Sequence, residues 1–263
     1  MRRLQMIKII SGYTGPGGST VSFSNLTNLF NDNGLETCFY GPHVWDGIKC
    51  NFGTLDKFQP TEDDIVIYHY LKVTSDLPCK KSILSCHETG LFKIKEMAGL
   101  HYDAAHFVSI FQKDWQGVEG TVIPNVLTKI QKNSKEGKPR VAGIIGSIDE
   151  NKCVPMSVKR ALADGHDDIR IYGSATQPNY FFQQIIPLLS NKVSYRGVAD
   201  DMQEIYDTLT DVYHSPRLET YNLIKPECEA AGVIYHGDEG NDTQAEYWDD
   251  QRIFEAWKNL LLV

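Results

Sequence analysis

The sequence has no sustained run of basic residues and no long apolar stretch. Its 263 residues include 26 Lys and Arg against 34 Asp and Glu, which gives a formal net charge of -8. Proteins that bind nucleic acids use Lys and Arg to neutralise phosphates, so a nucleic acid is not expected as the main partner. The basic start, Met1 to Arg3, leads into an apolar run too short for a membrane span or a signal sequence. We therefore expect a cytoplasmic protein with at most a peripheral membrane contact.

The cysteines show neither a CxxC pair nor a regular spacing, although disulfide frameworks and zinc sites usually do. We therefore expect reduced, mostly buried thiols and no metal site. The six positions are Cys38, Cys50, Cys79, Cys86, Cys153 and Cys228. A DxD pair in the context of metal ligands is also missing. The Asp-Asp pairs at 63–64, 167–168 and 200–201 are interpreted as helix caps or solvated turns.

The first expected strand is followed by a glycine-rich loop. Met6–Ser11 is a short apolar run, Gly12–Thr20 is the loop, and Val21–Asn33 has the apolar pattern of a helix. Glycines let a backbone approach a ligand closely, and a helix N-terminus attracts anions. The loop has neither the GxGxxG spacing of dinucleotide-binding folds nor the Lys-Ser/Thr of a P-loop. A tight turn without a ligand explains this loop equally well.

Short apolar runs alternate with helical patterns along the rest of the chain. In the first half, strands are expected at 36–40, 64–68, 82–86, 107–109 and 122–125, helices at 91–99 and 110–115, and an irregular segment at 41–60. In the second half, strands are expected at 141–145, 169–172, 193–195, 211–214 and 233–235, and helices at 154–163, 180–189 and 202–209. This alternation predicts an α/β fold with parallel sheets.

The repeated pattern predicts two Rossmann-like βα domains. The N-terminal domain is expected at 1–130, a polar linker at 131–139, the C-terminal domain at 140–240 and a C-terminal helix at 241–263. That helix is expected to pack back across the domain interface or, alternatively, only on its own domain. Two domains of this kind would face each other across a cleft, which is a common place for a ligand.

A histidine and two glutamates are candidate functional residues. His87 directly follows the strand expected at 82–86, where sites collect in open α/β sheets. A neutral imidazole there can bind a substrate hydroxyl, or it can simply satisfy local backbone groups. Glu219 and Glu227 stand eight positions apart, so on a regular helix they would share one face, although Glu219 can also lie in the turn before the helix. Glu88 and Glu96 have the same spacing, so spacing alone does not separate a site from coincidence.

Several segments in order resemble retaining glycosyltransferases of the GT-B fold, family 4 type. The resemblance covers nearly the whole chain and is strongest from Asp103 onward. The segments are Asp103–Lys113 (DAAHFVSIFQK), Thr121–Val126 (TVIPNV), Val141–Lys152 (VAGIIGSIDENK), Ile169–Ala175 (IRIYGSA), Val193–Glu219, and the E-x7-E pair Glu219 and Glu227 with Gly232 five positions on. An E-x7-E pair alone is a weak signal, whereas the ordered set is fairly specific.

The resemblance implies transfer of a sugar from a UDP- or GDP-linked donor to an acceptor hydroxyl, with retention of the anomeric configuration and no cofactor. It implies that Lys152 contacts the donor diphosphate, Glu219 and His87 lie by the transferring sugar, and Glu227 holds the ribose hydroxyls. Further donor contacts are implied for Gly17, Gly18, Ser147, Gly173, Ser174 and Val198. The acceptor is expected on the first domain and is a glycan, a lipid or a small molecule.

The chain also departs from the family pattern. Ser147 replaces the usual arginine, which removes one diphosphate cation unless Arg196 or Arg217 substitutes for it. Thr220 replaces a glycine, and the first domain is shorter than usual. A non-catalytic nucleotide-sugar or glycan-binding relative is therefore the alternative. A nicotinamide-dependent oxidoreductase is disfavoured because the GxGxxG spacing is missing.

Overall fold

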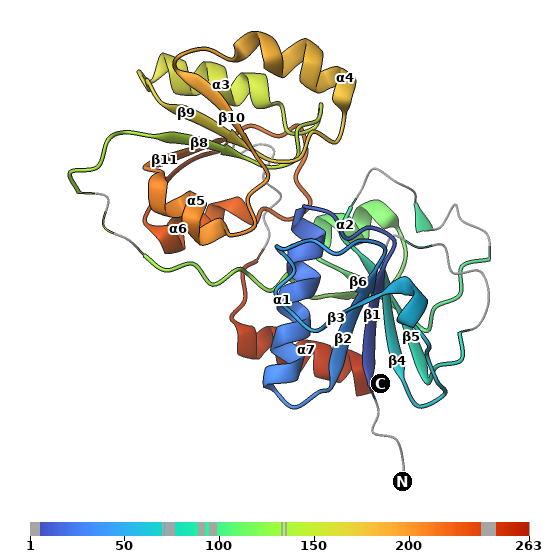
Figure 1. Cartoon of the computed structure of the whole chain (residues 1–263). Helices are drawn as coiled ribbons and strands as arrows, with labels where there is room; N and C mark the ends of the chain where they lie inside the picture. Colours follow the sequence, from blue (N-terminus) through green and yellow to red (C-terminus); the bar gives the residue numbers. More distant parts are fainter. Residues whose placement is uncertain are drawn as a thin grey trace. The chain divides into compact units, whose positions relative to one another are not determined.

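The computed structural model of the chain describes residues 6–69, 71, 77–88, 93–94, 99–132, 134, 136–237 and 246–262. The chain divides into two compact units, Met1–Val126 with Gln244–Val263, and Leu127–Thr243. Each unit contains one sheet whose strand pairs in the described residues are parallel, flanked by helices (Figure 1). The prediction of two Rossmann-like α/β domains is confirmed, whereas the expected cleft between them stays a prediction.

The first unit holds a seven-stranded sheet in the order β3-β2-β1-β4-β5-β6-β7. Its strands are β1 (Ile7–Ser11), β2 (Thr37–Gly41), β3 (Phe52–Thr54), β4 (Ile65–His69), β5 (Lys81–Cys86), β6 (Ala104–Phe107) and β7 (Thr121–Val122). Its helices are α1 (Gly18–Asp32), the short 3-10 helix η1 (Leu55–Lys57), α2 (Ile110–Gln116) and α7 (Asp250–Leu262). Because these strands are parallel, their carboxyl ends meet at one edge of the sheet.

Two details of this sheet differ from the sequence prediction. The segment 41–60, expected to be irregular, contains the edge strand β3, which is too short to show a periodic pattern; Phe52 packs edge-on against Phe39 with ring centroids 5.4 Å apart. The strand expected at 107–109 begins earlier, at Ala104. Ser109 instead caps α2, because its Oγ accepts a hydrogen bond from the amide of Gln112. The helix expected at 91–99 lies mostly outside the described residues.

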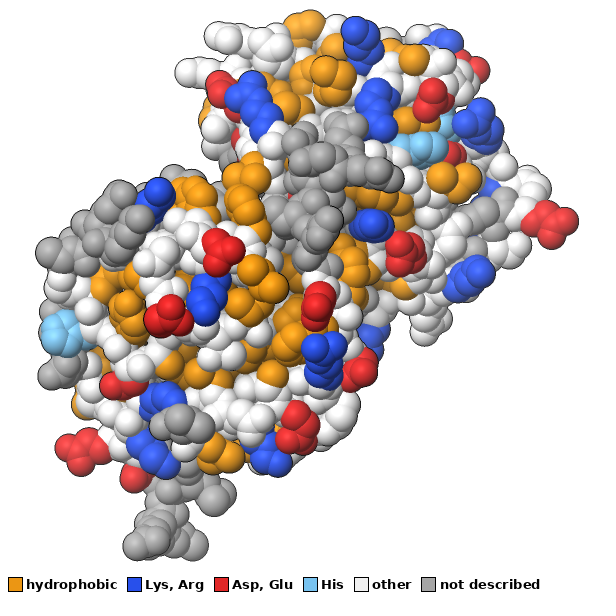
Figure 2. All heavy atoms as spheres, turned by 180° about the vertical axis from the view of Figure 1, so that it is seen from behind, with side chains coloured by type: hydrophobic (Ala, Val, Ile, Leu, Met, Phe, Trp, Pro, Cys, Tyr) orange, Lys and Arg blue, Asp and Glu red, His pale blue; other side chains and the backbone are white. Residues whose placement is uncertain are grey.

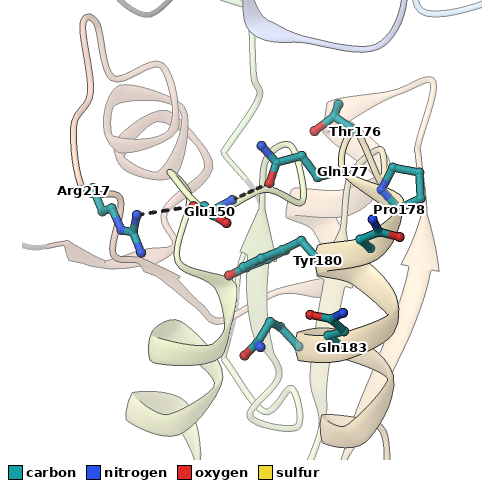
Figure 3. Close-up of a pocket in the computed structure, with 9 residues that line it drawn as sticks. Glu150, Thr176, Gln177, Pro178, Tyr180, Gln183 and Arg217 are labelled. Carbon is teal, nitrogen blue, oxygen red and sulfur yellow. Dashed lines mark hydrogen bonds and ion pairs between the residues drawn. The ribbon is translucent and has the colours of Figure 1, made fainter.

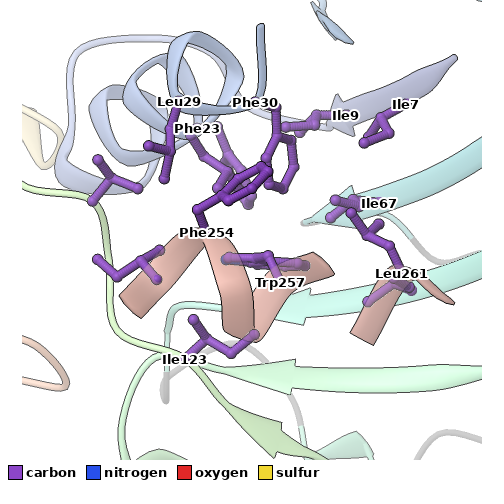
Figure 4. Packing of buried hydrophobic residues seen from close by; sticks show 14 of the residues in the cluster. Ile7, Ile9, Phe23, Leu29, Phe30, Ile67, Ile123, Phe254, Trp257 and Leu261 are labelled. Atoms are coloured by element: carbon purple, nitrogen blue, oxygen red, sulfur yellow. The ribbon is translucent and has the colours of Figure 1, made fainter. Parts of the chain in front are cut away.

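Helix α7 completes the hydrophobic core of the first unit (Figure 4). Trp257 is 2% exposed. Its ring meets Phe30 of α1 edge-on at 5.9 Å between centroids and lies 4.4 Å from the ring of His106 in β6. The last helix of the chain therefore packs on the N-terminal unit, which is the first of the two arrangements that the sequence left open.

The second unit holds a five-stranded sheet in the order β10-β9-β8-β11-β12. Its strands are β8 (Ala142–Ile145), β9 (Ile169–Tyr172), β10 (Val193–Gly197), β11 (Asp211–His214) and β12 (Ile234–Gly237). Its α-helices are α3 (Val154–Ala163), α4 (Pro178–Tyr180), α5 (Met202–Thr208) and α6 (Ile224–Ala231). The strand order reverses beside β8, so the loops after β8 and β11 leave the sheet at a topological switch point, where open α/β sheets bind ligands.

The described residues of the segment 131–139, which the sequence predicts as a linker, lie within the second unit. The boundary between the units follows Val126. The backbone of Gln131 exchanges two hydrogen bonds with the side chain of Gln203 in α5, and Lys138 donates to the carbonyl of Asp207. These contacts bind the polar segment to α5, so it counts as part of the second unit.

Charged side chains are mixed on the surface. On the face seen in Figure 2, Lys and Arg are interspersed with Asp and Glu and do not form a large patch of one sign. Within the described residues, no helix combines the length and the apolar character that crossing a bilayer requires.

Candidate active site

Two loops at the carboxyl edge of the second sheet are fastened to each other. One follows β8 and the other follows β11. Asn151 in the first loop donates from its side-chain amide to the carbonyl of Leu218 at 2.9 Å and accepts from the amide of Leu218 at 3.2 Å. The carbonyl of Asn151 also accepts from the amide of Arg217 at 2.7 Å. These three bonds bring together side chains that are far apart in the sequence.

Lys152 and Glu219 meet at this junction. The Lys152 Nζ lies 2.5 Å from Glu219 Oε2, and the two side chains are 22% and 13% exposed. Glu219 lies in the loop before α6, which begins only at Ile224, so Glu219 and Glu227 do not share a helix face. The structure therefore pairs two of the residues that the resemblance singles out, one a cation and the other a carboxylate, at the edge where a ligand is expected.

His214 is a third member of this group, and the sequence analysis missed it. Its Nε2 lies 3.4 Å from Glu219 Oε2, and its Nδ1 lies 3.1 Å from the hydroxyl of Tyr235. Burial, together with the charge of Lys152, lowers the pKa of His214 to about 3, so the imidazole is neutral at physiological pH. Its position as the last residue of the strand expected at 211–214 is the signal that could have identified it.

Two glycines bring the ends of β8 and β9 into close contact. Gly146 and Gly173 have φ of 142° and 149°, and a Cβ on Gly173 would lie 1.7 Å from the carbonyl oxygen of Gly146. No larger residue fits at position 173 without moving the backbone. The amide of Ile148 donates to the carbonyl of Ser174 at 2.8 Å, which holds the two loops together. The two strand ends therefore meet through backbone atoms, and the side chain of Lys152 lies next to Gly146.

Ser147 stabilises the loop rather than supplying a charge. Its Oγ donates to Asp149 Oδ2 at 2.6 Å, while Asp149 Oδ1 accepts from the backbone amide of Lys152 at 2.9 Å. This short chain of hydrogen bonds positions Lys152. Val198, which follows β10, is 38% exposed.

Glu227 lies on α6 and is buried, with 4% of its surface exposed. The hydroxyl of Tyr206 donates to its Oε2 at 2.9 Å. Burial raises the pKa of Glu227 to about 7, and hydrogen bonds from Tyr206 and Thr128 oppose that rise. A ribose bound by this carboxylate would have to share it with Tyr206.

A hollow of about 870 Å³ is lined in part by residues that are close to Lys152 and Glu219 in the sequence (Figure 3). Arg217 and Glu150, each two positions from a member of the pair, both line it and form an ion pair with 3.7 Å between Nη1 and Oε2. The side chain of Gln177 accepts from the amide of Glu150 at 3.3 Å. The rest of the lining is uncharged: Thr176, Pro178, Asn179, Tyr180, Gln183 and Gln184. Of the two arginines that could replace the missing cation at position 147, Arg217 lines this hollow.

His87 lies at the carboxyl edge of the first sheet and is 8% exposed. Its Nε2 is 3.2 Å from Ser85 Oγ, and its ring lies 4.5 Å from the ring of Phe23. Burial lowers its pKa well below the usual value, and His69 and His106 add to the effect, so His87 is neutral. Gly17 and Gly18 of the glycine-rich loop lie at the start of α1 in the same unit.

Comparison with known proteins identifies the fold. No protein-family model matches the chain, and no curated protein matches it. Among solved structures, HepE from Anabaena in complex with UDP and glucose aligns with a TM-score of 0.66 at 12% identity, over 89% of this chain and 81% of that one. AviGT4, a glycosyltransferase of avilamycin A biosynthesis, gives 0.65 at 15% identity over 96% and 87%. WaaG, a glycosyltransferase of lipopolysaccharide biosynthesis, gives 0.62 at 11% identity over 98% and 91%. The chain has the GT-B fold of these glycosyltransferases.

Proposed function

We propose that this protein is a glycosyltransferase that moves a sugar from a nucleotide-diphosphate donor to an acceptor hydroxyl with retention of the anomeric configuration. The observation that carries the proposal is the Lys152–Glu219 pair at the switch point of the second sheet, in a chain with the GT-B fold. HepE, which shares the fold, was solved with UDP and glucose bound. This supports a nucleotide sugar as the donor.

Lys152 stabilises the leaving diphosphate in this proposal. Negative charge develops on the phosphate oxygens as the bond to the sugar breaks, and a fixed cation in a partly buried site lowers the energy of that state. Glu219 compensates the charge of Lys152 in the free protein. When the donor binds, the diphosphate approaches Lys152, and Glu219 accepts a hydrogen bond from a sugar hydroxyl. No metal is required for these roles.

The remaining proposed donor contacts lie at the same carboxyl edge of the second sheet. In this proposal the nucleotide lies against the backbone at Gly146, Gly173 and Ser174, since glycine adds no side chain there and the Lys152 side chain lies next to Gly146. In its ionised form, Glu227 accepts hydrogen bonds from the ribose hydroxyls. The acceptor hydroxyl attacks the sugar carbon from the side that the phosphate leaves, and its proton passes to the leaving phosphate oxygen.

The test is a donor-hydrolysis screen over UDP- and GDP-sugars. The wild type should hydrolyse one of them slowly. Lys152→Ala and Glu219→Ala should each lower that rate by at least about a hundredfold, since both remove contacts to the reacting groups. Lys159→Ala, which removes an exposed lysine from α3 in the same unit, should leave the rate unchanged. Full activity of Lys152→Ala would show that this assignment is wrong.

A second candidate is a non-catalytic protein that binds a nucleotide sugar. The observation that favours it is Ser147, which hydrogen-bonds Asp149 where the family has an arginine for the diphosphate. Calorimetry with UDP- and GDP-sugars separates the two candidates. Binding that Lys152→Ala abolishes, without turnover of any bound donor by the wild type, would support the second.

A further inference from the structure

A buried ring nitrogen of His214 lies beside the Lys152–Glu219 pair without a hydrogen bond of its own. Among the described residues, the His214 Nε2 has no hydrogen-bond partner, although the side chain is only 4% exposed. Glu219 Oε2 is 3.4 Å away, and this same oxygen lies 2.5 Å from the Lys152 Nζ. A buried polar atom without a partner costs free energy, so its place next to the candidate site needs a physical reason.

The hydrogen bonds on the other side of His214 determine which ring nitrogen carries the proton. The Oδ1 of Asn222 accepts from the amides of Ile224 at 3.0 Å and Lys225 at 3.2 Å. The Nδ2 of Asn222 therefore faces Tyr235, and it donates to the Tyr235 hydroxyl at 2.7 Å. Because that hydroxyl oxygen already accepts, its own proton is directed at the His214 Nδ1, 3.1 Å away. His214 is neutral, so its single ring proton is on Nε2.

One carboxylate oxygen of Glu219 is thus within reach of two donors. The Lys152 ammonium is in contact with it, and the His214 N–H is near it but not bonded. The Glu219 side chain is only 13% exposed, and an unpaired charge in such a place is costly. If Lys152 moved away, a shift of about half an ångström would bring the His214 N–H to the 2.7–2.9 Å of a charge-assisted hydrogen bond. Little order would have to be created, because the proton is already on the correct nitrogen.

We propose that His214 is a positioning residue that holds Glu219 when the donor diphosphate draws Lys152 away. In the free protein, Lys152 binds the Glu219 carboxylate. With the diphosphate bound, the Nε2–H of His214 donates to Glu219 Oε2, and the other carboxylate oxygen accepts from a sugar hydroxyl. No covalent bond changes in this exchange. The identity of the diphosphate rests on the proposed function, whereas the exchange of donors requires only that Lys152 leave Glu219.

Imidazole NMR of the full chain at pH 8, where histidine is ordinarily neutral, tests the exchange without a nucleotide. In the wild type, the nitrogen shifts of His214 should place the proton on Nε2. In Lys152→Ala, the signal of that proton should move downfield, because its hydrogen bond to Glu219 forms. Adding Glu219→Gln to Lys152→Ala should reverse most of the shift, since a neutral amide is a weaker acceptor than a carboxylate. The ring signals of His166, which precedes β9 at the opposite edge of the sheet, should stay in place.

Calorimetry with UDP and GDP tests the same exchange in the proposed reaction. His214→Phe keeps a planar ring but removes the N–H, so the nucleotide that the wild type binds should bind at least about tenfold more weakly, because Glu219 is left without a donor. His214→Gln can place an amide N–H near the position of Nε2 and should recover most of the affinity. His236→Gln is the matched control, since the ring of His236 contacts Asp211 at 2.8 Å, and it should leave the affinity unchanged.

A proton on Nδ1 in the free wild type, or an unchanged Nε2–H signal in Lys152→Ala, would overturn the proposal even if His214→Phe does not fold. If UDP or GDP bound in a way that depends on Lys152, but equally tightly to His214→Phe, the role of His214 would be wrong and the proposed function would stand. If neither nucleotide bound the wild type, the proposed function would be wrong, and the spectrum of Lys152→Ala would still decide whether His214 replaces Lys152 at Glu219.

Discussion

Under the proposed function, Glu227 trades stability for binding of the nucleotide. A buried carboxyl is stable in its neutral form, and the hydroxyl of Tyr206 is placed to donate to it in either form. Binding two ribose hydroxyls requires an acceptor, which the ionised carboxylate provides best. The same burial that raises the pKa to about 7 therefore costs stability at the pH where a nucleotide would be bound.

Glu227→Gln should be more stable than the wild type at pH 8. The pKa is raised from 4.5 to about 7, so the folded wild type holds a proton that the unfolded chain releases, and its stability falls as pH rises through this window. The difference amounts to up to about 3 kcal/mol. Urea unfolding at pH 5 and pH 8 measures this difference. The free energies of unfolding of the two proteins should be similar at pH 5, and that of the variant should be larger at pH 8.

The same variant should weaken nucleotide binding if Glu227 holds the ribose. We expect a loss of about tenfold in calorimetry, consistent with one charge-assisted hydrogen bond. Glu229→Gln, an exposed change on the same helix, is the control for both measurements. If the free energy of unfolding depended on pH equally in Glu227→Gln and the wild type, the raised pKa of Glu227 would be contradicted.

Candidate site residues could be chosen from the sequence, but their partners could not. The resemblance pointed to Lys152 and Glu219, yet their ion pair depends on Asn151 joining the two loops, which no spacing reveals. His214 and Tyr206 were missed for the same reason. Their importance comes from what they contact in the folded chain, and contacts over long sequence separations are set by packing.

At the scale of elements, most strands follow from short apolar runs, because parallel strands are buried on both faces. The helix expected at 180–189 is the main exception. It is broken into α4 (Pro178–Tyr180), a π-helical turn (Phe181–Ile185) and a 3-10 turn (Ile186–Leu188). Pro187 lacks the amide proton that a continuous helix needs. Apolar periodicity identified the segment but not this interruption.

Helix α7 offers a direct test of core packing in the first unit. Trp257→Ala removes a ring that contacts Phe30 and His106, and should destabilise the unit by about 3–5 kcal/mol. Lys258→Ala, next to it on the solvent side, should change the free energy of unfolding by less than about 0.5 kcal/mol. Urea unfolding curves measure both. A small effect of Trp257→Ala would mean that α7 adds little to the core.

At the scale of the whole molecule, one unit is formed by a continuous segment of the chain and the other by two separate segments. The second unit is continuous, from Leu127 to Thr243, whereas the first needs both ends of the chain. The sequence pattern predicted two domains but placed the last helix in a segment of its own. Only the apolar face of that helix, with Ile253, Phe254 and Trp257 in the core of the first unit, shows where it belongs.

This difference predicts opposite behaviour of two fragments. The fragment 127–243 contains a complete sheet with its own core and the residues Lys152, Glu219 and Glu227. It should fold alone and bind UDP or GDP, whichever the intact chain binds, within about tenfold of the intact affinity, since a domain with its own core can fold independently. Circular dichroism melting and calorimetry measure the two properties.

The fragment 1–126 should not fold cooperatively, because without α7 the core around Phe23 and Phe30 is open to water. Adding a synthetic peptide of residues 244–263 should restore a cooperative melt, since the missing helix binds only the folded form and stabilises it by mass action. The peptide with Trp257→Ala should restore it less well at the same concentration. A cooperative melt of 1–126 without the peptide would show that α7 is an addition to a finished domain rather than part of its core.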